Sequence, residues 1–123
     1  MSQVQAGPLS FSANMRVRKA SDFRYIKERA QVQHSTTMLL LSATQEQGRA
    51  RLGLVVTKKT GCAAVRNRWK RKIREYFRLH PENFHNDQDY VFIVKSKTKG
   101  MPGTRLEQEI EYLLRKQDQG RML

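Results

Sequence analysis

The sequence contains little cysteine, no long apolar run and few acidic residues. Its single cysteine, Cys62, excludes an intramolecular disulfide and is typical of a reducing compartment. The strongest apolar run is the short stretch MLLL at 38–41, which is far shorter than a membrane-spanning helix requires. Residues 1–14 lack the charged start and apolar stretch of a secretory signal. These absences predict a cytoplasmic protein that has no membrane partner.

Acidic residues are heavily outnumbered by basic ones. There are 11 Asp and Glu residues against 24 Lys and Arg residues, which gives a formal net charge of +13 over 123 residues. Charge of this size opposes compaction, so a polyanion is the expected partner. An anionic membrane surface is the alternative, but it is usually bound through a polybasic tail or an amphipathic anchor. The length and the 38% hydrophobic content predict one domain with a modest core.

Residue patterns that catalyse a reaction or bind a metal are also missing. Cys62 and the three histidines do not have the spacing of a zinc finger. Asp87 and Asp89 are a candidate metal pair, but NDQD before a strand is more typical of a turn. No nucleophile has a recognisable base nearby in the sequence. The sequence therefore predicts a binding protein with no catalytic or metal-binding residues and no small-molecule substrate.

The order of apolar patterns predicts an α+β fold in a single domain over residues 15–116. The expected elements are a helix at 21–29, strands at 35–43 and 49–58, a basic helix at 63–78, a strand at 89–95 and a helix at 104–116. Thr104 and Glu107 form a capping-box pattern at the start of the last helix. Residues 1–14 are expected to be a flexible arm and 117–123 a frayed tail. The order α-β-β-(β)-α-β-α predicts a small mixed α/β sandwich, with helices covering one face of a sheet.

The basic stretch AAVRNRWKRKIREYFR, at 63–78, keeps the periodicity of an amphipathic helix. With about 100° per residue, one third of the circle is apolar and consists of Val65, Trp69, Ile73, Tyr76 and Phe77. The opposite side carries Asn67, Arg71, Arg74 and Arg78, with Arg68 and Lys70 beside them. A merely solvated face is the alternative, but such faces usually interleave acids, and only Glu75 is acidic here. One guanidinium group can donate two parallel hydrogen bonds to the oxygens of a phosphate, so this face is expected to bind a nucleic acid.

The residues before the basic helix favour the same ligand. Lys58, Lys59 and Gly61 lie between a predicted strand and the helix N-terminus, an arrangement that suits an anion. The glycine spacing and the Lys-Ser/Thr pair of a nucleotide-binding P-loop are missing, so nucleotide hydrolysis is not predicted.

With these features together, the chain resembles the protein component family of bacterial ribonuclease P over residues 11–116. The segment RLGLVVTKKTGCAAVRNRWKRKIREYF, at 51–77, is similar to the family signature of a strand, a Lys-Lys pair, a glycine and an Arg-Asn-Arg triplet. Here the triplet is Arg66, Asn67 and Arg68. The stretch RVRKASDF, at 16–23, is similar to the family's basic opening before its first helix.

The resemblance implies the partners and the fold. The family's catalyst is a large RNA, and the basic protein helps it to remove the 5′ leader from precursor tRNA. The resemblance implies that magnesium is bound by the RNA and that the protein itself binds no cofactor. It also implies a ribosomal-protein-like RNA-binding fold with a left-handed βαβ crossover around the basic helix. This crossover is an exception to the general rule that such connections are right-handed. The RNA-binding candidates are Lys58, Lys59, Arg66, Asn67, Arg68, Lys70, Arg71 and Arg74.

The resemblance further implies a cleft for the single-stranded leader between the sheet and the first helix. The candidates in this cleft are Phe23, Tyr25 and Lys27. The family often has a second aromatic residue where this chain has Lys27, so the resemblance implies weaker stacking on the leader here and a larger contribution from charge. Cys62 stands where a polar residue is common. Packing in the core is an equally good interpretation of Phe23.

Three other interpretations remain at this stage. A ribosomal or other general basic RNA-binding protein would explain the charge but not the spacing of the Arg-Asn-Arg triplet. A DNA-binding domain that used 66–78 as a recognition helix would need a preceding helix and a short turn. A nuclease acting alone would need an acidic or histidine cluster, which the sequence lacks.

Overall fold

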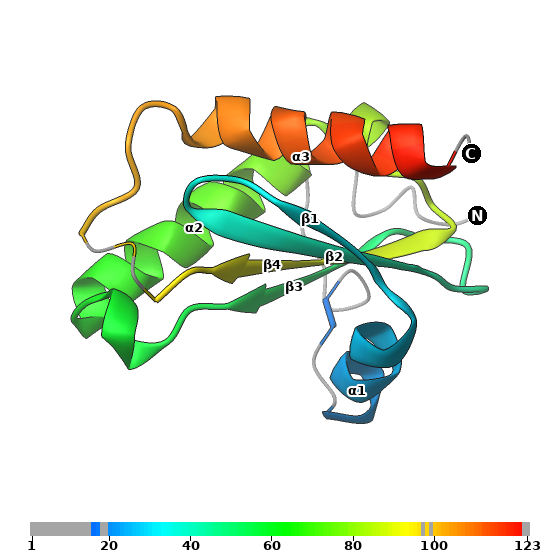
Figure 1. Cartoon of the computed structure of the whole chain (residues 1–123), viewed down its shortest axis with the longest axis horizontal. Coiled ribbons are helices and arrows are strands. Elements are labelled where there is room, and N and C mark those ends of the chain that lie inside the picture. Colours follow the sequence, from blue (N-terminus) through cyan, green and yellow to red (C-terminus); the bar gives the residue numbers. More distant parts are fainter. Residues whose placement is uncertain (1–15, 18–19, 97, 99, 122–123) are drawn as a thin grey trace.

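The computed structural model describes residues 16–17, 20–96, 98 and 100–121, and Figure 1 shows how they are arranged. The helices of this part are α1 (Ala20–Arg29), α2 (Ala63–Leu79) and α3 (Leu106–Arg121), with short 3-10 turns η3 (Lys58–Thr60) and η4 (Pro81–Asn83). The strands are β1 (Gln31–His34), β2 (Met38–Thr44), β3 (Arg51–Val55) and β4 (Gln88–Val94). The expected α+β class is confirmed. The expected flexible arm at 1–14 lies outside the described residues.

The four strands form one mixed sheet in the order β1-β2-β4-β3. The pairs β1–β2 and β2–β4 are antiparallel, whereas β3 and β4 are parallel neighbours. Because parallel neighbours cannot be joined by a hairpin, α2 makes the crossover between them. The carboxyl ends of β3 and β4 therefore lie at the same edge of the sheet, close to the start of α2.

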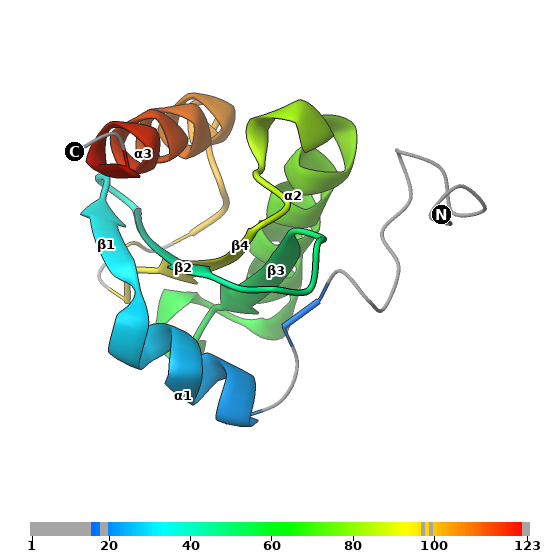
Figure 2. The ribbon, with the colours of Figure 1, turned by 90° about the vertical axis from the view of Figure 1, so that its right-hand side faces the viewer.

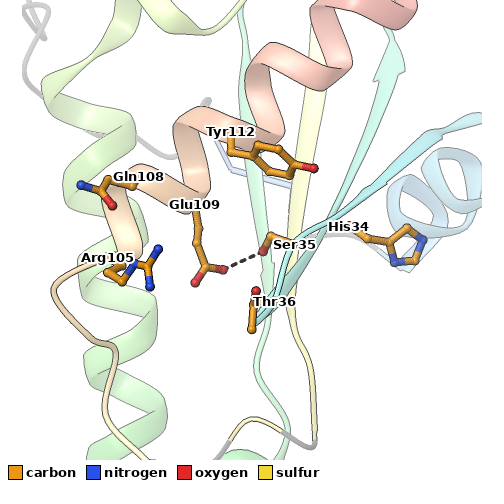
Figure 3. Close-up of a pocket in the computed structure, with 7 residues that line it drawn as sticks. All are labelled: His34, Ser35, Thr36, Arg105, Gln108, Glu109 and Tyr112. Carbon is orange, nitrogen blue, oxygen red and sulfur yellow. Dashed lines mark hydrogen bonds between the residues drawn. The ribbon is translucent and has the colours of Figure 1, made fainter.

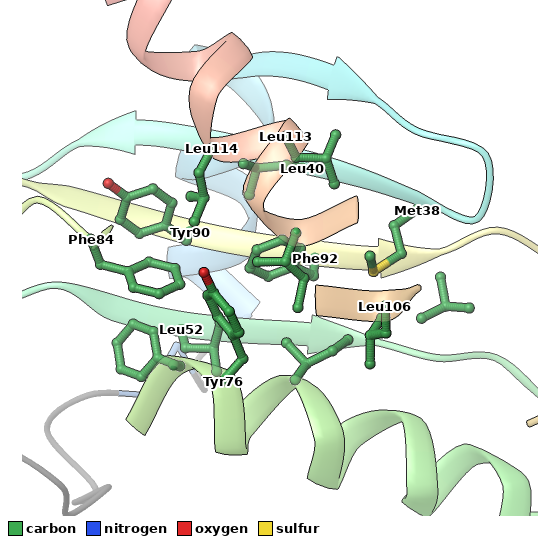
Figure 4. Packing of buried hydrophobic residues seen from close by; sticks show 14 of the residues in the cluster. Met38, Leu40, Leu52, Tyr76, Phe84, Tyr90, Phe92, Leu106, Leu113 and Leu114 are labelled. Atoms are coloured by element: carbon green, nitrogen blue, oxygen red, sulfur yellow. The ribbon is translucent and has the colours of Figure 1, made fainter. Parts of the chain in front are cut away.

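Both faces of the sheet are apolar, and each one packs against helices. Residues such as Leu40, Tyr90 and Phe92 face α2 and α3 and form the larger core cluster, which Figure 4 shows from close by. Leu41 and Val91, their neighbours along β2 and β4, belong to a second cluster with α1. Figure 2 shows α1 on the other side of the sheet from α2 and α3. The expectation that helices cover only one face was therefore wrong.

The strand expected at 35–43 is β2, and a strand that was not expected, β1, precedes it and forms a hairpin with it. β1 pairs with β2, and the amide of Ser35 donates to the carbonyl oxygen of Met38 across the turn, at 2.9 Å. The sequence QVQH of β1 is short and polar, so no apolar alternation indicated it. The next strand, β3, is shorter than expected, because residues after Val55 turn towards η3.

The last helix begins and ends later than expected. It starts at Leu106, so Thr104 does not occupy the N-cap position of the expected capping box. It continues to Arg121, and most of the expected frayed tail at 117–123 is therefore helical. Gln117 is only 1% exposed. Packing against the rest of the domain thus extends the helix beyond the point at which its apolar pattern weakens.

Candidate RNA-binding surface

The apolar side of α2 anchors this helix in the larger core. Trp69 and Ile73 are 2% and 1% exposed, and Tyr76 and Phe77 are also buried. Val65, one turn before Trp69, is half-buried against the same cluster. Figure 4 shows Tyr76 projecting from α2 towards the sheet. The expected buried stripe is confirmed, and it holds the opposite side of the helix in a fixed orientation.

That opposite side is basic and faces outwards. Asn67, Arg68 and Arg71 are exposed on α2. Lys70 and Arg74 flank them and are half-buried. Exposed guanidinium groups on this helix can meet phosphate oxygens without a further cost for ordering the backbone, because the helix is already formed.

Arg66 differs from the other two members of its triplet. It is half-buried, and its Nε donates to the carbonyl oxygen of Gly61 at 3.3 Å. A Cβ atom at Gly61 would lie 3.0 Å from Cγ1 of Val65, so the turn packs closely against the first turn of the helix. Arg66 therefore holds the turn before α2 in place, while Asn67 and Arg68 remain available to a ligand.

The N-terminus of α2 stabilises negative charge. Cys62 occupies the N-cap position, and the backbone N–H groups of Val65 and Ala64 lower the pKa of its exposed thiol. Lys58 and Lys59 lie just before it, exposed on the turn η3. Backbone donors and two exposed cations thus lie close together in the chain at the start of α2, a combination that suits an anion.

Trp69 also connects the basic surface to the loop before α3. Its indole Nε1–H donates to the carbonyl oxygen of Gly100 at 2.9 Å. The amide of Gly100 donates in turn to the carbonyl oxygen of Thr60, at the end of η3, at 3.4 Å. The sequence indicated Trp69 as a core residue but contained no signal for this connection, because the contact joins segments far apart in the chain.

The leader candidates on α1 do not share one side of the helix. The ring of Phe23 is half-buried beside β3, and a Cβ atom at Gly53 would lie 3.2 Å from its Cε1 and Cζ atoms. Lys27 is exposed one turn further on the same side. Tyr25 lies about 200° around the helix from Phe23. It is 44% exposed, and the guanidinium of Arg29 lies 4.2 Å from its ring centroid.

An apolar strip lies beside Phe23 on the face of the sheet that α1 covers. Leu39, Ile93 and Val55 are adjacent in register across β2, β4 and β3, and all three are only partly buried. With ten residues, α1 is about 15 Å long, too short to cover the whole face. The apolar residues of the strands were recognised in the sequence, but the partial exposure of this strip follows from the position of α1.

An ion-pair cluster attaches the start of α1 to the sheet. Nε and Nη2 of Arg51 donate to the two carboxylate oxygens of Asp89 at 2.8 and 2.7 Å, and Nη1 donates to Asp22 of α1 at 3.3 Å. Asp89 is 0% exposed, and its hydrogen bond with Arg51 raises the pKa of that guanidinium. Both carboxylate oxygens of Asp89 are therefore engaged by Arg51 rather than paired with Asp87.

A separate polar hollow of about 620 Å³ lies between the β1–β2 turn and α3. Figure 3 shows Glu109 pointing from α3 to Ser35 of the turn. The Glu109 carboxylate accepts hydrogen bonds from Ser35 Oγ at 2.7 Å and from the Thr37 hydroxyl at 2.6 Å. Burial acts to raise the pKa of Glu109, but these hydrogen bonds outweigh it and lower that pKa. Glu109 therefore fastens the turn to α3, and its carboxylate has a structural role.

Two further observations concern metals and membranes. Among the described residues, no group of three or more His, Cys, Asp and Glu side chains is placed to hold a metal ion. None of the described helices is long and apolar enough to span a bilayer.

The element before α2 is a strand followed by a 3-10 turn, so the DNA-binding interpretation, which needs a helix there, was wrong.

Comparison with known proteins identifies the family. The sequence profile of the Ribonuclease P family matches residues 11–118. The ribonuclease P protein component of Desulfosudis oleivorans is 37% identical over 87% of this chain and 88% of its own length. That of Syntrophus aciditrophicus is 34% identical over 90% of this chain and 93% of its own length.

Solved structures agree with this assignment. The RNase P protein of Staphylococcus aureus superposes with a TM-score of 0.75 and 28% identity, over 82% of this chain and 93% of that one. The RNase P protein of Thermotoga maritima gives a TM-score of 0.62 and 26% identity, over 86% and 93% of the two chains. The chain therefore belongs to the ribonuclease P protein family, and it is a protein subunit of this tRNA-processing endoribonuclease that acts with an RNA subunit.

Proposed function

We propose that the outer face of α2 binds the catalytic RNA of ribonuclease P. The observation that carries this proposal is the exposure of Arg68 and Arg71 on a helix whose other side, at Trp69 and Ile73, is almost completely buried. Lys58 and Lys59 extend the same surface at the helix N-terminus, and Asn67, Lys70 and Arg74 border it. Arg66 contributes mainly by holding the turn at Gly61.

We also propose that precursor tRNA contacts the protein through its 5′ leader. Phe23, Lys27 and the apolar strip of Leu39, Ile93 and Val55 provide a ring, a cation and apolar side chains on one side of the sheet. Unpaired bases stack on such surfaces while cations contact the backbone between them. Tyr25 is on the other side of α1, so we leave it out of the leader surface.

The contribution of the protein to cleavage is electrostatic and positional under this proposal. Its cations displace counterions from the two RNAs, which strengthens their association at low magnesium concentration. The magnesium ions and the hydrolytic step belong to the RNA subunit, and the protein supplies no catalytic side chain and binds no cofactor. The proposed site of action is the cytoplasm.

Reconstitution tests this proposal directly. Precursor tRNA with a labelled 5′ leader is mixed with a bacterial ribonuclease P RNA at low magnesium concentration, with and without this chain. We expect cleavage at the mature 5′ end only when the RNA and the protein are both present. Cleavage by the protein alone would place the chemistry on the protein. Tight RNA binding without any stimulation would instead favour a general RNA-binding protein.

A further inference from the structure

Acidic side chains are gathered on one side of α3. With about 100° per residue, three of its four acidic residues, Glu107, Glu111 and Asp118, lie within about 40° of one another around the helix. Glu111 accepts a hydrogen bond from the hydroxyl of Tyr76 on α2 at 3.2 Å, and the Asp118 carboxylate lies 2.8 Å from Nε2 of His85. The acidic side of α3 is therefore turned towards α2 and the segment that follows it.

The side of α3 next to the β1–β2 turn carries cations and a tyrosine. Arg105, Tyr112 and Lys116 also lie within about 40° of one another around the helix axis, and all three are exposed. Tyr112 is 42% exposed, and Nζ of Lys116 lies 5.7 Å from its ring centroid. Arg105 lies about two turns before Tyr112 and Lys116 about one turn after it. An accessible aromatic ring is thus bordered by a cation at each end.

The polar hollow of about 620 Å³ lies beside this ring. Tyr112 and Arg105 line it on the α3 side, and His34 and Thr36 line it on the side of the β1–β2 turn. Figure 3 shows Glu109 between Arg105 and Tyr112, with its carboxylate directed at the turn. Binding sites for small ligands have volumes of about 300–1,000 Å³, so the hollow is large enough for one nucleotide.

Glu109 indicates which kind of ligand suits the hollow. The three hydrogen bonds that Ser35 and Thr37 donate to this carboxylate all end on Oε1. The described residues donate no hydrogen bond to Oε2, which leaves that oxygen as an acceptor for a ligand. A carboxylate repels the side chains of an acidic peptide, whereas the N–H groups of a nucleobase can donate to it. The hollow therefore favours a base, with phosphate groups at the cations on its border.

Tyr25 has a similar exposure but different surroundings. It is 44% exposed and, like Tyr112, has a cation over its ring. The hollow beside it contains three carboxylates and one guanidinium, from Asp22, Glu46, Asp89 and Arg51. This excess of negative charge disfavours a phosphate there. Tyr25 is therefore a matched control for Tyr112.

We propose that the hollow beside Tyr112 binds one unpaired nucleotide of RNA. Its base stacks on the tyrosine ring, and its flanking phosphates contact Arg105 and Lys116, as in other sites for single-stranded RNA. The N–H edge of the base is directed at Oε2 of Glu109. This contact is additional to the proposed surface on α2 and does not depend on it. The catalytic RNA or the precursor tRNA can supply the nucleotide, and the experiment distinguishes them.

The first test compares Tyr112→Leu, Tyr112→Phe and Tyr25→Leu in the full chain. Two affinities are measured over a range of salt concentrations: that of the protein for a bacterial ribonuclease P RNA, and that of the reconstituted holoenzyme for precursor tRNA. Tyr112→Leu should weaken one of them about tenfold, with an unchanged salt slope, because stacking but no charge is lost. Tyr112→Phe keeps the ring and should bind normally, as should Tyr25→Leu.

The second test concerns the two cations. Arg105→Gln and Lys116→Gln should each lower the slope of log affinity against log salt by about 0.7, the value for one phosphate contact of a single strand. Arg115→Gln, at an exposed position of α3 about 60° from Tyr112, should leave the slope unchanged. Unfolding temperatures should stay close to that of the unmodified chain, because all these side chains are exposed.

The affinity that changes identifies the RNA. Weaker binding to the catalytic RNA by Tyr112→Leu would assign the nucleotide to that RNA. Normal binding there, with weaker binding of precursor tRNA by the holoenzyme, would assign it to the substrate. Either result supports the inference.

Three outcomes would overturn the inference. Normal affinity of Tyr112→Leu for both RNAs would remove the hollow from RNA binding, and if labelled oligoglutamate bound the unmodified chain but not this variant, the ligand would be an acidic peptide. An equal loss in Tyr25→Leu would show a general surface effect. A lower unfolding temperature of Tyr112→Leu with normal affinities would make the ring structural. Arg68→Ala tests α2 separately, so failure of the proposed α2 surface is distinguishable from failure at Tyr112.

Discussion

The indole of Trp69 lies in the core and donates a hydrogen bond of 2.9 Å to the carbonyl oxygen of Gly100. The same residue therefore fixes the buried side of α2 and the loop that leads to α3. The exposed Arg68 and Arg71 are close to it in sequence but lie on the outer side of the helix. This arrangement separates residues that stabilise the fold from residues available to RNA.

Replacing Trp69 should affect stability and leave RNA recognition intact. Trp69→Phe keeps most of the packing but removes the donor to Gly100, which should cost about 1–2 kcal/mol. Trp69→Ala leaves a cavity and should cost about 3–5 kcal/mol. Urea unfolding followed by circular dichroism measures both values. Weaker RNA binding by a Trp69→Phe protein of normal stability would contradict the assignment.

Replacing Arg71 should have the opposite effect. Arg71→Ala should weaken binding to the catalytic RNA and lower its salt slope by about one, because one phosphate contact is lost. Its unfolding temperature should stay close to that of the unmodified chain, since Arg71 is exposed. Filter binding at several salt concentrations and a thermal melt test both statements, with Arg115→Ala as control. A collapse of stability with an unchanged slope would mean that Arg71 is structural.

Phe23 can be tested with substrates that differ only in leader length. Phe23→Leu keeps an apolar side chain beside Gly53 but removes the ring. Because stacking of a base on an aromatic ring contributes about 1–3 kcal/mol, KM should rise about fivefold or more for precursor tRNA with a long leader. A substrate with a minimal leader should show little change. Tyr25→Leu, on the other side of α1, is the control. An equal effect on both substrates would favour a purely structural role of Phe23.

Glu109 should make stability depend on acid pH. The pKa of Glu109 is lowered in the folded protein, so its contribution is present above the pKa of the unfolded chain and is lost as pH falls through the folded value. Between about pH 6 and about pH 3, the unfolding temperature of Glu109→Gln should therefore fall less than that of the unmodified chain. The unfolding temperature of Glu82→Gln, a variant at an exposed position, should fall with pH as much as that of the unmodified chain. Identical pH profiles for Glu109→Gln and the unmodified chain would contradict the role of the carboxylate at Ser35 and Thr37.

Much of α2 could be predicted from the sequence because an amphipathic helix is a local pattern. The spacing of Trp69, Ile73 and Phe77 determines which side is buried, whatever the partner elements are. The opposite side then follows from the same periodicity, and the resemblance to the ribonuclease P family rests on residues within this stretch. The candidate RNA-binding residues on α2 were accordingly the most accessible to sequence reasoning.

Two of the misses have a common physical cause, which is pairing or packing with residues far away in the chain. β1 is short and polar, so its strand conformation depends on pairing with β2 and carries little apolar signal of its own. The end of α3 depends on packing at Gln117. Tyr25 was grouped with Phe23 by closeness in sequence, but the turn of the helix places the two rings apart.

The sequence by itself determined the charge, the amphipathic basic helix, the class of fold and the family, because each is carried by composition or by residues close together in the chain. Only the tertiary structure decided that Leu39, Ile93 and Val55 form a half-covered strip, and that Asp89 is neutralised by Arg51. These relationships join segments brought together by strand order and by the opposite placement of α1 and α2. Such contacts depend on long-range packing, which a local pattern does not encode.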